Sequence, residues 1–121
     1  MTQVLFIEDN EYLCKIVPYT LKQDGIQCLA VNSASEGLRA AREQQFDIVV
    51  TDINMPGMNG LELISKLREA KNYKDTPILC LTTEIDPATL AEAKARGAQE
   101  VVSKPYTPQE LLAAIQQQLA G

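Results

Sequence analysis

The chain has 121 residues, of which 45% are hydrophobic and 22% are charged, values typical of one globular domain with its own core. Its net charge of −5 argues against direct binding to DNA or to an anionic membrane, and its apolar runs are too short to cross a bilayer. The chain has no histidine, which excludes Ser-His-Asp catalysis, histidine-ligated zinc and a role as a histidine phosphocarrier.

Cysteine usage and the N-terminal sequence bear on the cellular compartment. Cys14, Cys28 and Cys80 are odd in number, widely spaced and set among apolar residues, so we expect reduced core thiols instead of disulfides. The N-terminus has no basic segment and soon reaches the acidic pair Glu8-Asp9, which argues against a signal peptide. These features predict a cytoplasmic protein.

Five short apolar runs alternate with five segments in which apolar residues recur at helical spacing. The runs predict strands over residues 4–7, 26–31, 48–52, 77–82 and 100–103. The helical patterns predict helices over residues 13–24, 33–44, 59–71, 86–97 and 107–119. The segment Asn72 to Thr76 is predicted to be a polar loop.

Capping and breaking residues support these helices. Ser33 begins a capping box, and Asp86 is an N-cap that is followed by proline at the first helical position. Pro18 lies within the first helix and predicts a kink, because proline lacks the N–H that the helical hydrogen bond needs. The last helix is expected to bury Leu111, Leu112, Ile115 and Leu119.

The regular alternation of strands and helices, joined by short connections, predicts an α/β fold. Right-handed crossovers between parallel strands place helices on both faces of the sheet. We therefore predict a single doubly wound (βα)5 domain over residues 1–121. In an open sheet of this kind, ligands bind at the edge formed by the carboxyl ends of the strands.

Polar side chains stand where four of the five predicted strands end. These side chains are Glu8 and Asp9 after the first strand, Asp52 at the third, Thr82 at the fourth and Lys104 after the fifth. Two like charges about 5 Å apart, in an effective dielectric near 20, repel by about 3 kcal/mol. Three carboxylates at one sheet edge therefore need a cation, or they take up protons.

Lys104 supplies one positive charge to this cluster, and a divalent ion is expected to supply the rest. Oxygen-only ligands suit Mg²⁺, whereas zinc would favour histidine or a pair of cysteines. A Mg²⁺ ion, an ammonium group and a hydroxyl around one aspartate are typical of phosphoryl transfer, with Asp52 as the nucleophile.

At this point the sequence resembles a known family, the receiver domain of two-component response regulators, from about Val4 to Leu119. The motifs that carry the resemblance each follow a predicted strand: Glu8-Asp9, Asp52-Ile53-Asn54-Met55-Pro56-Gly57-Met58-Asn59-Gly60, Thr82, and Lys104-Pro105. The resemblance implies a flavodoxin-like fold with a parallel five-stranded sheet of order 2-1-3-4-5, which is the order known for the family.

The resemblance also implies roles for individual residues. Asp52 would accept a phosphoryl group from a histidine kinase or a phosphotransfer protein. Thr82 and Lys104 would bind the phosphoryl oxygens, and the peptide bond between Lys104 and Pro105 would be cis. Mg²⁺ would be held by Glu8, Asp9, Asp52 and the backbone carbonyl of Asn54.

Among receiver domains, the sequence most resembles the single-domain chemotaxis (CheY-like) type. Asn54 lies two residues after the phosphoacceptor and Glu84 two after Thr82, so both side chains would flank the path of the hydrolytic water and tune the lifetime of the phosphoryl group. Thr83 stands where a smaller residue is usual and is expected to slow access to that group. At the position of Val101, many members carry an aromatic residue whose ring swings as the threonine moves. Val101 has no ring, which puts this form of the switch in doubt.

The expected function is a phosphorylation-dependent signalling switch that catalyses only its own phosphorylation and dephosphorylation. It would bind a downstream protein through the face formed by residues 86–97, 100–103 and 107–119. We expect either a stand-alone receiver or a receiver segment of a longer regulator. A phosphohydrolase of the haloacid-dehalogenase type also uses a strand-end aspartate, but it needs a second aspartate where this chain has Asn54. A flavodoxin-like cofactor binder would need a first loop that is less acidic.

Overall fold

The computed structural model describes residues 1–120. Five strands alternate with five α-helices, and a short 3-10 helix precedes the fourth strand. The strands are β1 (Gln3–Ile7), β2 (Gln27–Val31), β3 (Ile48–Asp52), β4 (Ile78–Thr82) and β5 (Glu100–Ser103). The helices are α1 (Glu11–Gln23), α2 (Ala34–Glu43), α3 (Gly60–Glu69), η1 (Lys71–Tyr73), α4 (Pro87–Arg96) and α5 (Pro108–Ala120).

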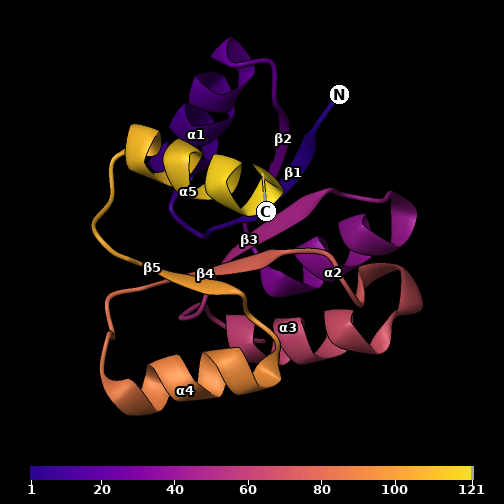
Figure 1. Cartoon of the computed structure of the whole chain (residues 1–121), viewed down its shortest axis with the longest axis vertical. Helices are drawn as coiled ribbons and strands as arrows, with labels where there is room; N and C mark the ends of the chain where they lie inside the picture. The colour runs from indigo at the N-terminus through magenta and orange to yellow at the C-terminus, as the bar shows by residue number, and fades with distance from the viewer. Residues whose placement is uncertain (121) are drawn as a thin grey trace.

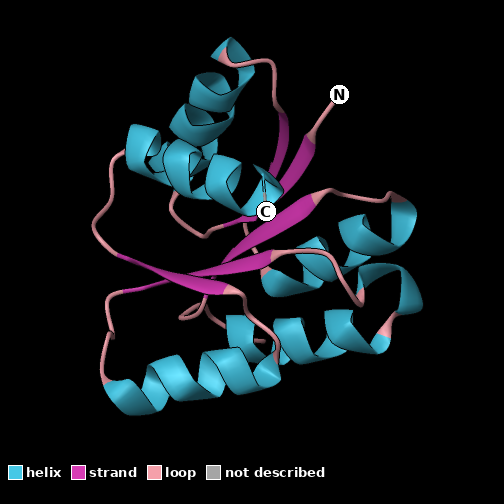
Figure 2. Ribbon diagram, in the orientation of Figure 1, coloured by secondary structure: helices cyan, strands magenta, loops and turns pink. Residues whose placement is uncertain are grey.

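All neighbouring strands are parallel, and their order is β2-β1-β3-β4-β5. Helices α1 and α5 cover one face of the sheet, whereas α2, α3 and α4 cover the other (Figure 1; Figure 2). This arrangement confirms the predicted doubly wound α/β fold and its strand order.

The apolar runs form strands that are buried on both faces. Every residue of β3 and β4 is buried, whereas β2 and β5, at the two edges of the sheet, are only partly covered. Side chains alternate along each strand and fill two separate cores. The core under α1 and α5 is called here the upper core, and the core under α2, α3 and α4 the lower core.

The prediction of a polar loop at Asn72–Thr76 was wrong in part. Residues Lys71–Tyr73 form η1, and the side chain of Tyr73 is only 1% exposed. Its hydroxyl donates a hydrogen bond to the Gln44 carbonyl oxygen (2.6 Å) and accepts one from the Phe46 N–H (3.2 Å). One turn of 3-10 helix is too short to show a hydrophobic period, which is why sequence reasoning missed it.

Arg68 also has a structural role that its charge did not reveal. Its guanidinium donates hydrogen bonds to the carbonyl oxygens of Tyr73 (2.6 Å), Thr76 (2.7 Å) and Gly97 (2.7 Å). These bonds join the C-terminal turn of α3 to the segments that lead into β4 and β5. Arginine suits this position because its planar fork donates several hydrogen bonds at once.

Three smaller expectations need correction or comment. Leu119 is 36% exposed, because the last turn of α5 extends past the upper core. All three cysteines are free thiols, but Cys14 and Cys28 are only half-buried and Cys80 alone is fully buried. Helix α1 passes through Pro18 without a break, so the kink there stays a prediction.

No helix within residues 1–120 has the length and apolar character that crossing a bilayer requires.

Candidate functional site

The carboxyl ends of β1, β3 and β5 bring three charged side chains to one place. Residues two positions before Glu8, Asp52 and Lys104 pack in the upper core, so strand alternation directs these three side chains toward that side of the sheet edge. Thr82 lies two residues after a residue of the lower core and follows the opposite alternation. Thr82 therefore reaches the same carboxyl edge of the sheet with its side chain on the lower-core side.

Lys104 joins the two buried carboxylates of the site. Its Nζ lies 2.9 Å from Asp52 Oδ2 and 3.0 Å from Glu8 Oε1. Carboxylate oxygens of Glu8, Asp9 and Asp52 all lie within 4.8 Å of one another. Glu8 and Asp52 are buried, whereas Asp9 is exposed and leaves the cluster open to solvent.

Burial and neighbouring charges shift the pKa values of Glu8 and Lys104. Burial, supported by repulsion from Asp52, raises the pKa of Glu8 to about 7 despite its contact with Lys104. Burial opposes the charge on Lys104, but the contacts with Asp52 and Glu8 outweigh it and raise the pKa of the ammonium. With Lys104 as its cationic neighbour, Glu8 therefore takes up a proton readily near neutral pH.

The donor set of the cluster fits a hard divalent cation. Its three carboxylates offer only oxygen, which Mg²⁺ prefers, and one side of the cluster is open to the water molecules that Mg²⁺ retains. Glu8 Oε1 is buried, and its contact with the Lys104 ammonium (3.0 Å) leaves this oxygen a second lone pair. A buried carboxylate oxygen with free acceptor capacity is a suitable metal ligand.

The loops after β3 and β4 meet beside the cluster. Asn54 Nδ2 donates a hydrogen bond to Glu84 Oε1 (3.1 Å), which joins two residues that are 30 positions apart in the sequence. Thr82 is fully buried, and its hydroxyl oxygen accepts a hydrogen bond from the Glu84 N–H (2.9 Å). Thr83 is exposed and lines a hollow of about 370 Å³ together with Lys104.

The loop between β3 and α3 turns back tightly onto the strand it leaves. Gly57 has a φ of 76°, in the left-handed region that favours glycine. The N–H of Gly60 donates to the Ile53 carbonyl oxygen (2.9 Å), so α3 begins directly against the end of β3. On the other side of the site, the peptide bond between Lys104 and Pro105 is cis.

Val101 and Tyr106 lie on opposite sides of the sheet. Val101 is half-buried and packs against the lower core, on the same side as Thr82. Tyr106 packs against the upper core, where the charged cluster lies, and its hydroxyl is buried. The position of Tyr106 directly after Lys104-Pro105 does not show from the sequence which side of the sheet the ring occupies.

Comparison with known proteins gives one consistent result. The family model of the response regulator receiver domain matches residues 4–116. A chemotaxis protein CheY homolog of Campylobacter jejuni is 35% identical over 113 residues, which are 90% of this chain and 85% of that protein. The sensory/regulatory protein RpfC of Xanthomonas campestris is 31% identical over 112 residues, which are 91% of this chain but 15% of that protein.

A solved structure gives the same picture. The chemotaxis response regulator CheY4 of Vibrio cholerae superposes with a TM-score of 0.92 at 37% sequence identity. The superposition covers 97% of this chain and 98% of that chain. The resemblance thus extends over almost the whole length of both chains.

Proposed function

The chain belongs to the response regulator receiver domain family, and from this we propose that it is a phosphorylation-dependent switch whose phosphoacceptor is Asp52. Receiver domains serve phosphorylation-based signalling and interact with histidine kinases and downstream targets. The observation that carries the assignment is the placement of Asp52. Its carboxylate is buried, lies 2.9 Å from the Lys104 ammonium and is within 4.8 Å of two further carboxylates.

In the proposed reaction, a carboxylate oxygen of Asp52 attacks the phosphorus of a phosphohistidine on the donor protein. The new O–P bond forms as the N–P bond breaks, and the histidine imidazole leaves with the electron pair of that bond. Lys104 lies close enough to Asp52 to pair with a phosphoryl oxygen of the product. Mg²⁺ held by Glu8, Asp9, Asp52 and the Asn54 carbonyl would neutralise negative charge on the phosphoryl oxygens.

A small-molecule phosphodonor tests this function without the unknown kinase. The chain is incubated with acetyl phosphate and Mg²⁺, and its intact mass is measured by mass spectrometry. We expect a mass gain of one phosphoryl group. No gain is expected when the metal is chelated before acetyl phosphate is added. A wild-type chain that gains no phosphoryl group under these conditions would overturn the proposed function.

Thr82, Asn54 and Glu84 are proposed to act after phosphorylation. The Thr82 hydroxyl is bonded to the Glu84 N–H in this structure, and moving toward a phosphoryl oxygen would require it to give up that bond. The Asn54–Glu84 hydrogen bond lies between the two loops that border Asp52, where hydrolytic water would enter. Together with the exposed Thr83, this pair is proposed to set the lifetime of the phosphoryl group.

The proposed output surface is formed by α4, β5 and α5, which lie together at one side of the molecule (Figure 1). The exposed positions of α4 include Ala88, Ala91 and Ala95 beside the charged Glu92 and Lys94, and β5 is an edge strand whose residues are only partly covered. Ile85, in the loop before α4, is 59% exposed. This surface offers apolar contact area close to Thr82. A movement of Thr82 can therefore change the surface that a partner protein contacts.

Replacing Asp9 with alanine is expected to raise the dissociation constant for Mg²⁺ by at least about tenfold, because it removes one of the three clustered carboxylates. Isothermal titration calorimetry measures this constant directly. Glu11→Ala is the matched control, since it removes an equal charge from the exposed first turn of α1 and lies outside the cluster. An unchanged titration in Asp9→Ala would refute the assignment of Asp9 as a ligand.

Replacing Val101 with alanine is expected to leave phosphoryl uptake from acetyl phosphate intact. Val101 packs against the lower core, away from the side on which Lys104 meets Asp52, so its removal should cost only about 1 kcal/mol of stability. Uptake is followed by intact mass over time, and stability by urea unfolding. A large loss of phosphoryl uptake in a folded Val101→Ala variant would show that this residue belongs to the reactive site.

A further inference from the structure

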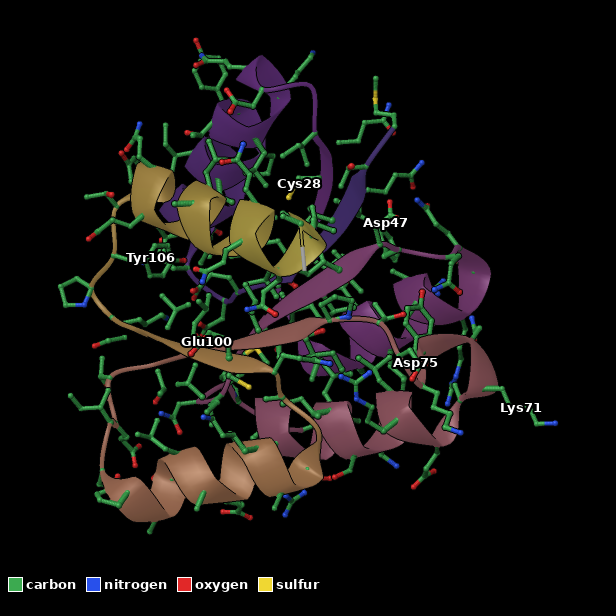
Figure 3. The ribbon with its side chains drawn as sticks, viewed as in Figure 1. Cys28, Asp47, Lys71, Asp75, Glu100 and Tyr106 are labelled. Carbon is green, nitrogen blue, oxygen red and sulfur yellow. The ribbon has the colours of Figure 1, made fainter. Side chains whose placement is uncertain are left out.

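The two edge strands of the sheet differ in the residues that protect them. Strand β5 begins with the exposed Glu100 and is followed by Lys104 and Pro105, residue types that discourage pairing with a further strand. Strand β2, at the other edge, lies in a stretch from Gly25 to Ser35 that contains neither a charged residue nor a proline. In Figure 3, Glu100 marks β5 and Cys28 marks β2. The edge of β2 is therefore the unprotected one.

Part of the backbone of β2 points away from the sheet. The Gln27 N–H and the Val31 carbonyl oxygen both make hydrogen bonds on the β1 side, at 2.9 and 3.0 Å. Successive residues of a strand direct their backbone groups to opposite sides, so Cys28 and Ala30 direct theirs toward the free edge. These N–H and carbonyl groups have no strand partner within residues 1–120.

Apolar side chains flank this edge. Leu29 is 43% exposed in β2, and Tyr19 is 62% exposed on the neighbouring helix α1. Both line a hollow of about 440 Å³, together with Pro18, Ile26 and Cys28. The edge thus combines unpaired backbone groups with apolar contact area, which are the two features that an added strand uses.

We propose that β2 of a second copy of this chain pairs antiparallel with β2, around a two-fold axis at Leu29. The pairing joins the two five-stranded sheets into one continuous sheet. In this register, Leu29 lies opposite Leu29 of the second copy, and Cys28 lies opposite Ala30. The outward N–H and carbonyl groups of Cys28 and Ala30 then bond across the axis.

The strand is complementary to itself in this register, which favours a second copy as the occupant. On the α1 side of the sheet, the small side chains of Cys28 and Ala30 face each other. On the α2 side, Leu29 meets its own copy, and Gln27 meets Val31. No like charges meet along the strand, although a net charge of −5 makes two copies repel elsewhere. An acidic chain approaches its own copy most easily where charge is absent.

The pairing leaves the rest of the molecule accessible. The charged cluster lies at the carboxyl ends of β1, β3 and β5, and β5 lies at the far edge of each sheet from β2. The dimer therefore presents two copies of the proposed output surface at opposite ends. A partner with two binding sites would bind such a dimer more tightly than it binds one copy. This bivalent role rests on the proposed function, whereas the pairing of β2 does not.

Cysteine cross-linking tests the register. Directly opposite residues that are not hydrogen-bonded have Cα atoms about 4.5 Å apart, a separation that a disulfide spans. We therefore expect Leu29→Cys to form an intermolecular disulfide on mild oxidation, seen as a doubled mass under non-reducing conditions and located by peptide mapping. In the wild type, the two Cys28 residues would be about 8 Å apart, too far for a disulfide, so no cross-link is expected.

The matched control is Gln27→Cys. Gln27 is exposed and lies on the same face of β2 as Leu29, but its two copies would be about 13 Å apart in the proposed register. This variant should therefore stay uncross-linked. Equal cross-linking of the two variants, or cross-linking of neither, would overturn the proposed pairing.

Sedimentation velocity tests whether the dimer forms without a cross-link. A short strand offers a small contact area, so we expect half of the wild-type chains to be dimeric only near about 100 μM. Added salt should strengthen the dimer, because it screens the repulsion between two acidic chains. Leu29→Lys brings two ammonium groups together and should raise the dissociation constant at least about tenfold.

The control for this substitution is Leu119→Lys, since Leu119 is 36% exposed on α5 and lies outside β2. It should dimerise like the wild type. A wild type that stays monomeric at about 1 mM, or a dimer that Leu29→Lys leaves intact, would contradict the proposal. A dimer that takes up no phosphoryl group would overturn the proposed function alone, and a phosphorylated chain that stays monomeric would overturn the pairing alone.

Discussion

Replacing Asp52 with asparagine is expected to abolish phosphorylation of the chain by acetyl phosphate and Mg²⁺. The amide keeps the size of the side chain and can still accept a hydrogen bond from Lys104, but its oxygen is a far weaker nucleophile than a carboxylate oxygen. The substitution also removes one of three mutually repelling negative charges, so the variant should fold. Intact-mass spectrometry should therefore show a folded protein with no added phosphoryl group.

The control for this experiment is Asp75→Asn. Asp75 is an exposed aspartate in the segment before β4, and the same chemical change there should leave phosphorylation at the wild-type level. If Asp52→Asn still gains a phosphoryl group, peptide mapping would locate the acceptor. A group on Glu8 or Asp9 would mean that the cluster, and not Asp52 in particular, carries the reactivity.

The grouping of charged residues at one sheet edge was predictable from the sequence. Short apolar runs alternating with helical patterns leave little freedom in an α/β fold, and parallel strands bring their carboxyl ends to a common edge. Glu8, Asp52 and Lys104 each stand at the end of such a run. The sequence alone therefore predicted that these three side chains come together. The structure adds that Lys104 contacts both of the other two, at 2.9 and 3.0 Å.

The contacts between loops were not predictable in the same way. The hydrogen bond from Asn54 to Glu84 depends on the exact course of two loops, and neither loop has a repeating pattern that fixes its shape. The bond between Thr82 and the Glu84 N–H is local, but a threonine at a strand end has several possible partners. The burial of Tyr73 was missed because it follows from tertiary packing of an irregular segment.

Replacing Gly60 with alanine is expected to destabilise the fold by about 3 kcal/mol or more, a cost at the upper end for overpacking. A Cβ at this position would overlap the carbonyl oxygen of Asp52 and would lie 2.9 Å from Ile53 Cα. Both obstacles are backbone atoms, and β3 is buried on both faces, so no side-chain rotation relieves the overlap. Urea unfolding of the wild type and the variant measures the loss.

Gly57→Ala is the matched control, because Gly57 lies in the same loop and has no atom near its would-be Cβ. Its cost should come only from its left-handed backbone, about 1 kcal/mol, and should therefore be clearly smaller. Equal destabilisation by the two substitutions would refute the overlap argument. The obstacle at Gly60 is the backbone of Asp52, the proposed phosphoacceptor, so the folded fraction of Gly60→Ala should also take up phosphoryl groups more slowly than Gly57→Ala. This links the tight turn after β3 to the position of Asp52.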